Sequence, residues 1–253
     1  MDRNLIFCFS GTGNSLKAAK DIAEHLGDTE IVLMKGGHKI SGAYNRIGFV
    51  FPCYAGGVPK AVIEYISQLE ITADSADWFF SVVTCGGSER DSLPMLRDAL
   101  LRKGISLDYG RALHTVGNYI AMYPLKPGVS ETLNAAESEM AAYVGEIKEK
   151  LKTSIGKVSL GVALFYKGGN FYFKTRAKKL AASDACTACG MCEKLCPTGS
   201  IKVTDDKPAF RRQTCAQCMA CLQWCPAEAI NCGSETIGRT RYHHPDVQAE
   251  ELL

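Results

Sequence analysis

The sequence lacks any apolar run of the about 18 residues that a membrane-spanning helix needs. Its densest apolar stretches, residues 47–51 and 78–83, are only as long as strands. The first residues hold only a very short apolar segment before a glycine turn, so we expect no signal peptide and a cytoplasmic location. These features predict a globular protein with no membrane partner.

The chain also lacks an excess of charge of either sign. Its 29 Lys and Arg residues against 27 Asp and Glu residues give a net charge of +2 over 253 residues. General nucleic-acid binders present a strongly basic surface, so we expect no nucleic-acid partner. The apolar fraction of 46% excludes wholesale disorder, and the length suits one large domain or two smaller ones.

Cysteine is abundant, with 12 residues in the chain. Thiols stay reduced in the expected location, so metal ligation is a better first explanation than disulfides. Cys8, Cys53 and Cys85 are scattered, whereas the other nine lie within residues 186–232. The net charge is −3 over residues 1–151, +6 over 152–185 and −1 over 186–253. We predict an N-terminal domain over 1–151, a basic-aromatic connector over 152–179, a cysteine-rich domain over 180–235 and a tail over 236–253.

The cysteine-rich part contains an internal repeat. Four cysteines and a proline, at Cys186, Cys189, Cys192, Cys196 and Pro197, recur with the same spacing as Cys215, Cys218, Cys221, Cys225 and Pro226. Three thiolates at i, i+3 and i+6 on a tight loop can bind three irons of a cubane cluster, and the cysteine before the proline can supply a fourth ligand. Structural zinc prefers separated Cys-x-x-Cys pairs and fits these runs poorly.

This pattern resembles the bacterial two-[4Fe–4S] ferredoxins over about residues 180–235, and the resemblance implies a small α+β domain. In that family the fourth cysteine of each run ligates the other cluster. The resemblance therefore implies one cluster on Cys186, Cys189, Cys192 and Cys225, and a second on Cys215, Cys218, Cys221 and Cys196. Cys232 aligns with Val203 in the repeat, so we interpret it as a buried hydrophobic residue and not a ligand.

Residues 1–151 alternate between strand-like and helix-like patterns. Strands are predicted at residues 5–9, 31–34, 46–51, 77–84 and 112–120. Helices are predicted at residues 15–26, 59–69 and 91–103, and from an N-cap at Ser130 to about residue 152. Such an alternation implies an α/β domain whose parallel sheet is covered by helices on both faces.

The turn between the first strand and the first helix, Ser10-Gly11-Thr12-Gly13-Asn14-Ser15, suits a phosphate. Its glycines let the backbone approach closely, and the helix N-terminus offers N–H groups without partners. The turn contains no Lys or Arg, so neutral hydrogen bonds would hold the phosphate. It lacks the third glycine of the dinucleotide fingerprint and the Gly-Lys pair of the P-loop, so neither motif fits.

The turn resembles the FMN phosphate loop of the flavodoxin family, which would cover roughly residues 3–150. The resemblance implies a doubly wound five-stranded sheet in the order 2-1-3-4-5, with FMN at the switch point between the first and third strands. It places FMN-binding residues in three loops: Ser10, Thr12, Gly13, Asn14 and Ser15; then Pro52, Cys53, Tyr54, Ala55 and Gly56; then Thr84, Cys85, Gly86 and Gly87. Tyr54 is the candidate for stacking on the flavin ring. The third loop has no aromatic residue, so one flavin face is predicted to be open to a substrate, to Tyr119 or Tyr123, or to the cysteine-rich domain.

The connector interleaves aromatic and basic residues between Lys167 and Lys179. Two interpretations stay open: the aromatic residues anchor it to one domain while the charges face acidic groups, or it is a solvated helix. The tail, with His243 and His244, is predicted to be either a docking strand or a frayed end. We assign it no metal.

Taken together, the two domains resemble the ferredoxin–flavodoxin fusion proteins of anaerobes. The resemblance implies an electron-transfer protein that relays electrons between two [4Fe–4S] clusters and FMN, to or from low-potential redox partner proteins. The alternative is an FMN-dependent reductase of a small molecule, fed by the ferredoxin domain, with a pocket lined by Tyr119, Met122 or Tyr123. The sequence shows no nicotinamide domain and no acid–base pair beside the flavin, so we assign no catalytic residue.

Overall fold

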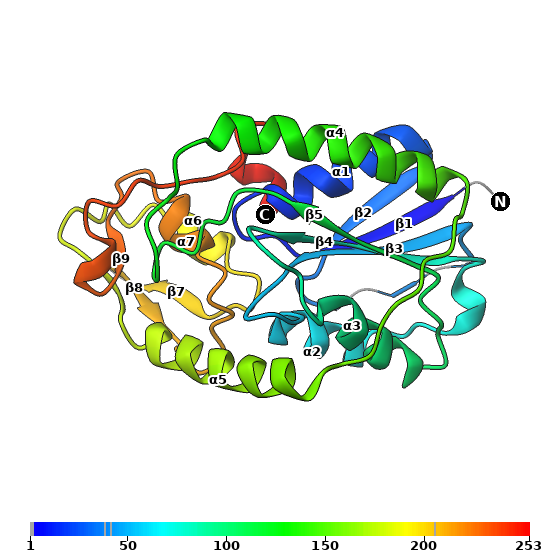
Figure 1. Ribbon diagram of the computed structural model, residues 1–253. Coiled ribbons are helices and arrows are strands. Elements are labelled where there is room, and N and C mark those ends of the chain that lie inside the picture. Colours follow the sequence, from blue (N-terminus) through cyan, green and yellow to red (C-terminus); the bar gives the residue numbers. More distant parts are fainter. Residues whose placement is uncertain (1–2, 38, 41, 205) are drawn as a thin grey trace.

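The computed structural model describes residues 3–37, 39–40, 42–204 and 206–253, and its first part is built on a parallel sheet (Figure 1). The strands are β1 (Asn4–Cys8), β2 (Thr29–Leu33), β3 (Arg46–Pro52), β4 (Phe79–Cys85) and β5 (Tyr109–His114). Their order is β2-β1-β3-β4-β5, and every pairing is parallel. This confirms the predicted flavodoxin-like sheet and its strand order.

Helices cover both faces of the sheet. On one face lie α1 (Asn14–Leu26) and α4 (Val129–Lys148), and on the other α2 (Lys60–Gln68) and α3 (Ser92–Leu101) (Figure 1). Successive side chains of a strand point to opposite faces, so β1 sends Phe7 into the core under α2 and α3 and Cys8 into the core under α1 and α4. Cys8 is fully buried and is therefore a core residue.

Two predicted elements of this part were misplaced. The fifth strand ends at His114, and residues 115–120 leave the sheet after the Thr115 N–H donates to the Cys85 carbonyl. Ile120 packs into the core of the cysteine-rich part and Val116 is buried outside the sheet, so the apolar pattern here does not mark a strand. The last helix of this domain begins after Gly128, at φ +80°, and not after Ser130, and it ends at Lys148. The helix begins after Gly128 because its N-cap is left-handed, a conformation that glycine adopts more readily than other residues.

The cysteine-rich part has an α+β fold, as predicted. Two antiparallel pairs, β6 (Leu180–Ala182) with β9 (Ile230–Cys232) and β7 (Ile201–Thr204) with β8 (Lys207–Phe210), accompany the short helices α6 (Met191–Lys194) and α7 (Ala220–Gln223). The sequence repeat is also a backbone repeat. Ala188 and Gln217 occupy equivalent positions and both have positive φ, as do Gly190 and Met219.

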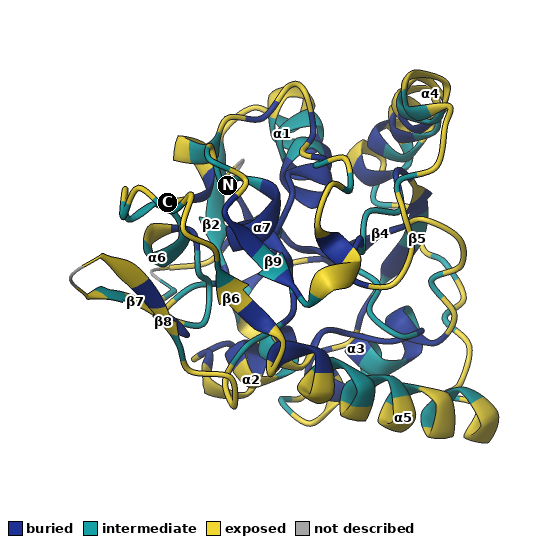
Figure 2. Ribbon diagram, turned by 90° about the vertical axis from the view of Figure 1, so that its left-hand side faces the viewer, coloured by how far each residue is buried: buried dark blue, intermediate teal, exposed yellow. Residues whose placement is uncertain are grey.

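The connector contains α5 (Leu160–Ala177), which runs beneath both parts of the molecule (Figures 1 and 2). The tail packs back on the first domain, where the His244 N–H donates to the Thr12 carbonyl. Residues 236–253 are all described and contain no strand, only the short helices η2 (Ser234–Thr236), at their start, and η3 (Ala249–Leu252), so the predicted docking strand is wrong although the docking itself occurs. One further short helix, η1 (Ala73–Ser75), precedes β4.

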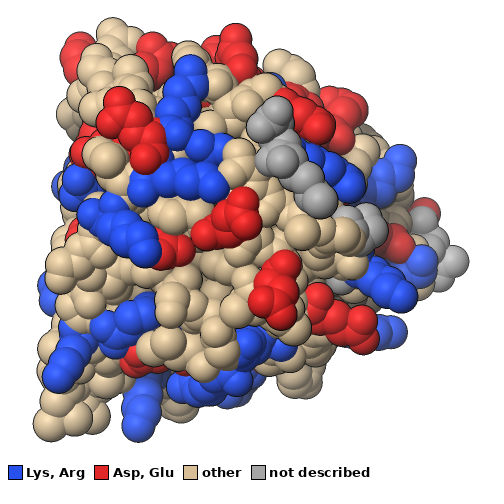
Figure 3. All heavy atoms as spheres, turned by 90° about the vertical axis from the view of Figure 1, so that its right-hand side faces the viewer, with Lys and Arg blue, Asp and Glu red and all other residues tan. Residues whose placement is uncertain are grey.

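The surface away from the cysteines carries mixed charge. Figure 3 shows the face on the right-hand side of Figure 1, where Lys and Arg atoms are interspersed with Asp and Glu atoms. Among the described residues, none of the helices is both long enough and apolar enough to cross a membrane.

Candidate functional site

The glycine-rich turn after β1 is tied to two distant segments. Gly13 forms the N-cap of α1 at φ +98°, and the first N–H groups of the helix have no partner within it. Thr12 Oγ1 accepts a 2.8 Å hydrogen bond from Asn118 Nδ2, and Ser15 shares one of 2.7 Å with Thr84. Asn14 Nδ2 donates to the Val116 carbonyl. These bonds hold the turn against the ends of β4 and β5.

Beside this turn, at the carboxyl ends of the central strands, lies a cavity of about 470 Å³. Most of the predicted FMN-binding residues line it: Ser10, Thr12, Asn14, Ser15, Pro52, Cys53, Tyr54, Ala55, Thr84, Cys85 and Gly86. Gly13, Gly56 and Gly87 do not. A side chain at Gly13 would meet His244 of the tail, and one at Gly56 would meet Arg90. The structure thus brings the three predicted loops together around one space.

Tyr119, Met122 and Tyr123 also line the cavity, as expected for a pocket beside the flavin, whereas helix α5 was not expected there. Phe165, Gly168, Gly169, Tyr172 and Phe173 of α5 form one side. The Phe173 ring meets the edges of the Tyr54 and Tyr119 rings, with centroids 6.0 and 5.2 Å apart. The alternating aromatic residues of the connector were the available signal, because they are what anchors α5 over the cavity.

The cavity suits FMN on three grounds. Its volume lies within the roughly 300–1,000 Å³ typical of ligand sites. The N-terminus of α1 offers unpaired N–H groups to a phosphate, and the hydroxyl and amide groups of the turn add neutral donors. The aromatic wall offers flat apolar surface to a ring system. Among the described residues that line it there is no Asp, Glu, Lys, Arg or His, in keeping with a phosphate held by neutral groups.

Two of the cysteines on the cavity wall have weakly acidic thiols. Burial raises the pKa of Cys85 to about 12 and also raises that of Cys53. The Cys53 thiol contacts the Glu89 carbonyl at 3.5 Å, and the Cys85 thiol contacts that of Gly87 at 3.7 Å. Neither thiol is therefore poised as a nucleophile.

The eight cysteines of the repeat gather in two sets of four, each around its own small cavity. One set is Cys186, Cys189, Cys192 and Cys225. The other is Cys196, Cys215, Cys218 and Cys221. In each set three cysteines come from one repeat and the fourth from the other. The structure thus groups the cysteines as the resemblance to two-cluster ferredoxins implies.

Both sets have the donor chemistry of an iron–sulfur site. Burial, with a contribution from the neighbouring thiols, raises the pKa of Cys192 to about 11 and that of Cys218 to about 12. A bound metal reverses this preference, because a coordinated thiol is deprotonated. The Ser200 N–H donates to Cys196 Sγ at 3.1 Å, and Gln217 Nε2 donates to Cys215 Sγ at 3.5 Å. Donors of this kind stabilise negative charge on the sulfur atoms.

Cys232 lines neither cysteine cavity. It is fully buried in the core of the cysteine-rich part, and its thiol contacts the Arg176 carbonyl at 3.3 Å. Its interpretation as a small hydrophobic residue is confirmed as far as burial goes.

The second cysteine set adjoins the large cavity. Gln217, Cys218 and Met219 line both that cavity and the cavity of the set Cys196, Cys215, Cys218 and Cys221. A side chain at Gly11 would collide with the Cys218 carbonyl, so the phosphate turn and the cysteine loop touch through their backbones. Tyr119 adds a link between the two, since its hydroxyl donates to Gln217 Oε1 at 2.9 Å. No cysteine of the first set lines the large cavity.

The tail also packs at the junction where the glycine-rich turn meets the cysteine-rich part. The Tyr242 hydroxyl donates to Asn14 Oδ1 at 2.6 Å. His243 stacks on Trp224 with ring centroids 4.0 Å apart, and Trp224 Nε1 donates to the Gly11 carbonyl at 2.9 Å. The two histidines of the tail therefore have packing roles. Nothing in their sequence context revealed these contacts, because all of them join segments far apart in the chain.

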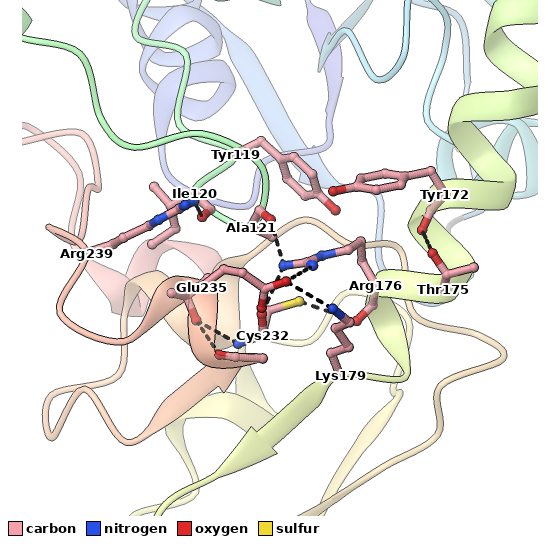
Figure 4. Close-up of polar contacts among 12 residues, drawn as sticks. Tyr119, Ile120, Ala121, Tyr172, Thr175, Arg176, Lys179, Cys232, Glu235 and Arg239 are labelled. Atoms are coloured by element: carbon pink, nitrogen blue, oxygen red, sulfur yellow. Dashed lines mark hydrogen bonds and ion pairs between the residues drawn. The ribbon is translucent and has the colours of Figure 1, made fainter.

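A buried arginine fastens α5 to both parts of the molecule (Figure 4). Arg176 is 5% exposed and donates to the Glu235 carboxylate and to the carbonyls of Ala121 and Cys232, at 2.7, 2.7 and 3.0 Å. Lys179 also donates to Glu235, and the two cations hold the pKa of that carboxyl at about 2, with the Arg176 bond as the largest cause. The aromatic connector is thus anchored to both domains, not to one.

Comparison with known proteins gives three matches for the cysteine-rich part. Residues 179–230 match the 4Fe-4S dicluster domain family. The chain is 44% identical over 48 residues to the ferredoxin-like protein in the vnf region of Azotobacter vinelandii, a match that covers 17% of this chain and 74% of that protein. It is 37% identical over 57 residues to a component of the ion-translocating oxidoreductase complex of Methanosarcina acetivorans, which covers 22% of each. The chain thus spans only about a fifth of that longer relative.

Solved structures are similar to the first part at a low level. The flavodoxin of Fusobacterium nucleatum, bound to flavin mononucleotide, has a TM-score of 0.40 at 15% identity, covering 59% of this chain and 99% of that one. The rubredoxin oxygen:oxidoreductase of Desulfovibrio gigas has a TM-score of 0.40 at 15% identity, covering 59% and 37%. At these scores the flavodoxin-like description rests on the strand order of the sheet itself.

Proposed function

Because the chain belongs to the family of ferredoxin-like proteins through its 4Fe-4S dicluster domain, we propose that it relays electrons between two [4Fe–4S] clusters and one FMN, to or from redox partner proteins. When bound, each cluster exchanges single electrons and the flavin takes one or two. The observation that carries the proposal is the shared wall of Gln217, Cys218 and Met219 between the large cavity and one cysteine set.

The two cysteine sets have different places in this relay. The set of Cys196, Cys215, Cys218 and Cys221 would hold the cluster next to the flavin, because it borders the flavin cavity. The set of Cys186, Cys189, Cys192 and Cys225 would hold the outer cluster. A partner protein that meets the outer set would thus be linked to the flavin through the inner one.

The side chains at the junction fix this arrangement. The glycine at position 11 allows the phosphate turn to touch the Cys218 carbonyl directly. Tyr119 and Gln217 fill the remaining space with a hydrogen-bonded pair, and burial of the Tyr119 hydroxyl raises its pKa far above the ordinary range, so it stays neutral. A direct contact between two redox sites suits electron exchange, which needs the two cofactors close together.

One observation favours the alternative, an FMN-dependent reductase of a small molecule. Met122 lines the cavity and is 60% exposed, so the cavity opens to solvent there. The same cavity offers no Asp, Glu, His, Lys or Arg side chain, among the residues that the structure describes, to deliver a proton. Hydrogenation of a substrate needs such a donor or water, which makes the relay the better-supported function.

Cofactor analysis of anaerobically purified protein tests the proposal. Two four-iron sites require about eight irons and eight labile sulfides per chain, together with one FMN. Leucine at positions 12 and 14, in place of Thr12 and Asn14, should abolish flavin retention and leave the iron content unchanged. Stoichiometric zinc without sulfide, or FMN that copurifies with the double variant, would contradict the assignment.

A further inference from the structure

One face of α5 is a continuous exposed stripe. Its residues, which we call the α5 stripe, follow one another at alternating spacings of four and three: Leu160, Leu164, Lys167, Phe171, Lys174 and, just after the helix, Lys178. This spacing places side chains on one side of a helix. Leu160, Leu164 and Phe171 are 79%, 61% and 70% exposed, which is unusual for large apolar side chains. Figure 2 shows this exposed surface along the outside of α5.

The charge of the stripe has a single sign. Residues 152–183 contain seven Lys and Arg and no Asp or Glu. Arg176 and Lys179 pair with Glu235, but no carboxylate of the described residues lies within ion-pair distance of Lys167, Lys174 or Lys178. Two leucines lie at the start of the stripe and two lysines at its end, with Lys167 and Phe171 between them. This contrasts with the mixed charge of the face in Figure 3.

The opposite side of α5 forms a wall of the flavin cavity. Gly168, Tyr172 and Phe173 line that cavity, and the Tyr166 hydroxyl donates to the Val58 carbonyl at 2.6 Å, which fixes the helix in place. An α-helix with its side chains is about 10–12 Å across. A protein bound to the α5 stripe would thus lie about one helix diameter from the cavity.

We propose that the α5 stripe is the docking surface for an acidic electron-transfer protein, with Leu160, Leu164 and Phe171 at the centre of the contact and the three lysines beside them. This inference rests on the proposed relay function and adds the chemistry of its partner. An apolar centre flanked by charge is the ordinary composition of a protein interface. Unpaired lysines of one sign attract an acidic partner over a distance and speed its association.

The test uses the anaerobic holoprotein and a reduced, acidic bacterial two-[4Fe–4S] ferredoxin as the electron donor, mixed in a stopped-flow instrument. In wild type, the second-order rate constant of electron transfer should fall as salt is added, because salt screens the attraction. K174E/K178E should lower the rate constant about tenfold at low salt, the lower end of electrostatic effects on association. Phe171→Ser should weaken the complex at all salt concentrations. Lys148→Glu, on the exposed side of α4, is the control for a Lys-to-Glu change away from the stripe and should behave as wild type.

Two further measurements separate the possible failures. Dithionite is a small reductant that needs no docking surface. It should reduce the clusters and the flavin to the same extent in wild type and in K174E/K178E. If the flavin of wild type stays oxidised while the clusters are reduced, the relay function itself is wrong. If that transfer is intact but K174E/K178E accepts electrons from the ferredoxin at the wild-type rate, the docking proposal is wrong. If the ferredoxin does not reduce the wild-type protein, or reduces it at a rate that salt does not change, the docking proposal is also wrong.

The stripe could instead meet a lipid surface, and vesicles test this. Vesicles of phosphatidylglycerol and phosphatidylcholine in equal parts should fail to sediment the wild-type protein. Cosedimentation that K174E/K178E abolishes would assign the stripe to anionic lipid and overturn the proposal.

Discussion

Replacing Arg176 by methionine should loosen the junction between the two domains and α5. The guanidinium is buried and donates to one carboxylate and two backbone carbonyls, those of Ala121 and Cys232. Methionine fills similar space but leaves both carbonyls without this donor. A buried polar group that loses its partner costs about 1–3 kcal/mol. The Glu235 carboxylate is part-exposed and can turn to water, so its loss adds little. The two carbonyls together give about 2–6 kcal/mol, and we expect about 3 kcal/mol, in the lower half of that range.

This loss of stability in Arg176→Met should appear as local opening, because the bonds of Arg176 join three segments at one point. At about 1.4 kcal/mol for each factor of ten, 3 kcal/mol corresponds to an opening equilibrium raised about a hundredfold. Hydrogen exchange of the anaerobic holoprotein, resolved by mass spectrometry, measures this directly. Peptides that contain Ile120–Ala121 and the end of α5 should exchange about a hundred times faster, and peptides of β1 and β3 should be unchanged.

Lys179→Met is the matched control, since Lys179 donates to the same Glu235 but is half exposed. An exposed ion pair contributes about 0–1 kcal/mol, so exchange should rise by no more than about fivefold. If Arg176→Met and Lys179→Met raise exchange equally, the buried bonds to the two carbonyls are not what holds the junction.

Three further predictions concern the cofactor sites. Gly11→Ala pushes a Cβ toward the Cys218 carbonyl and should slow flavin reduction by the clusters at least tenfold with unchanged iron and FMN, whereas Gly145→Ala on the outside of α4, where the new Cβ meets nothing, should leave the rate alone. Burial lowers the pKa of His244, so the neutral histidine stabilises the folded state fully above its unfolded pKa of about 6.5, and this stabilisation is lost as the pH falls below that value. The tail should then release the phosphate turn, and the fluorescence of free flavin should rise between pH 7 and 5. The rise should be smaller in His244→Gln. Iron and sulfide analysis should show that Cys221→Ser loses about four of the irons and that Cys232→Ser loses none. Equal losses in the two variants would mean that Cys232 is a cluster ligand.

The sequence predicted best where one local pattern determines the structure. The eight cysteines fall into the two expected sets because cluster-binding loops need particular spacings, and the same spacing gives Ala188 and Gln217 their matching left-handed backbone. The parallel sheet followed from alternating strands and helices, and its strand order from the resemblance of the phosphate turn to that of the flavodoxin family. Both are short-range signals that tertiary contacts do not override.

The rest could not be predicted, because it depends on contacts between distant segments. The Asn118 bond to Thr12, the Tyr242 bond to Asn14 and the wall formed by α5 each join residues that only the folded chain brings together. The fifth strand was misplaced for the same reason. Ile120 is buried in the core of the cysteine-rich part and Val116 is buried outside the sheet, and an apolar sequence pattern does not distinguish such residues from those of a strand.

The central claim is that electrons reach the flavin through the cluster bound by Cys196, Cys215, Cys218 and Cys221. Cys221→Ser tests it most directly, because this cysteine lines the cluster cavity but not the flavin cavity. Flavin reduction by a reduced ferredoxin is followed in the anaerobic variant, loaded with FMN and retaining the outer cluster, in a protein that also carries K174E/K178E, so that direct donation at the α5 stripe is weakened. The account predicts that reduction of the flavin becomes at least a hundredfold slower than in K174E/K178E alone, while reduction of the outer cluster stays fast. Flavin reduction at the rate of K174E/K178E alone would contradict it.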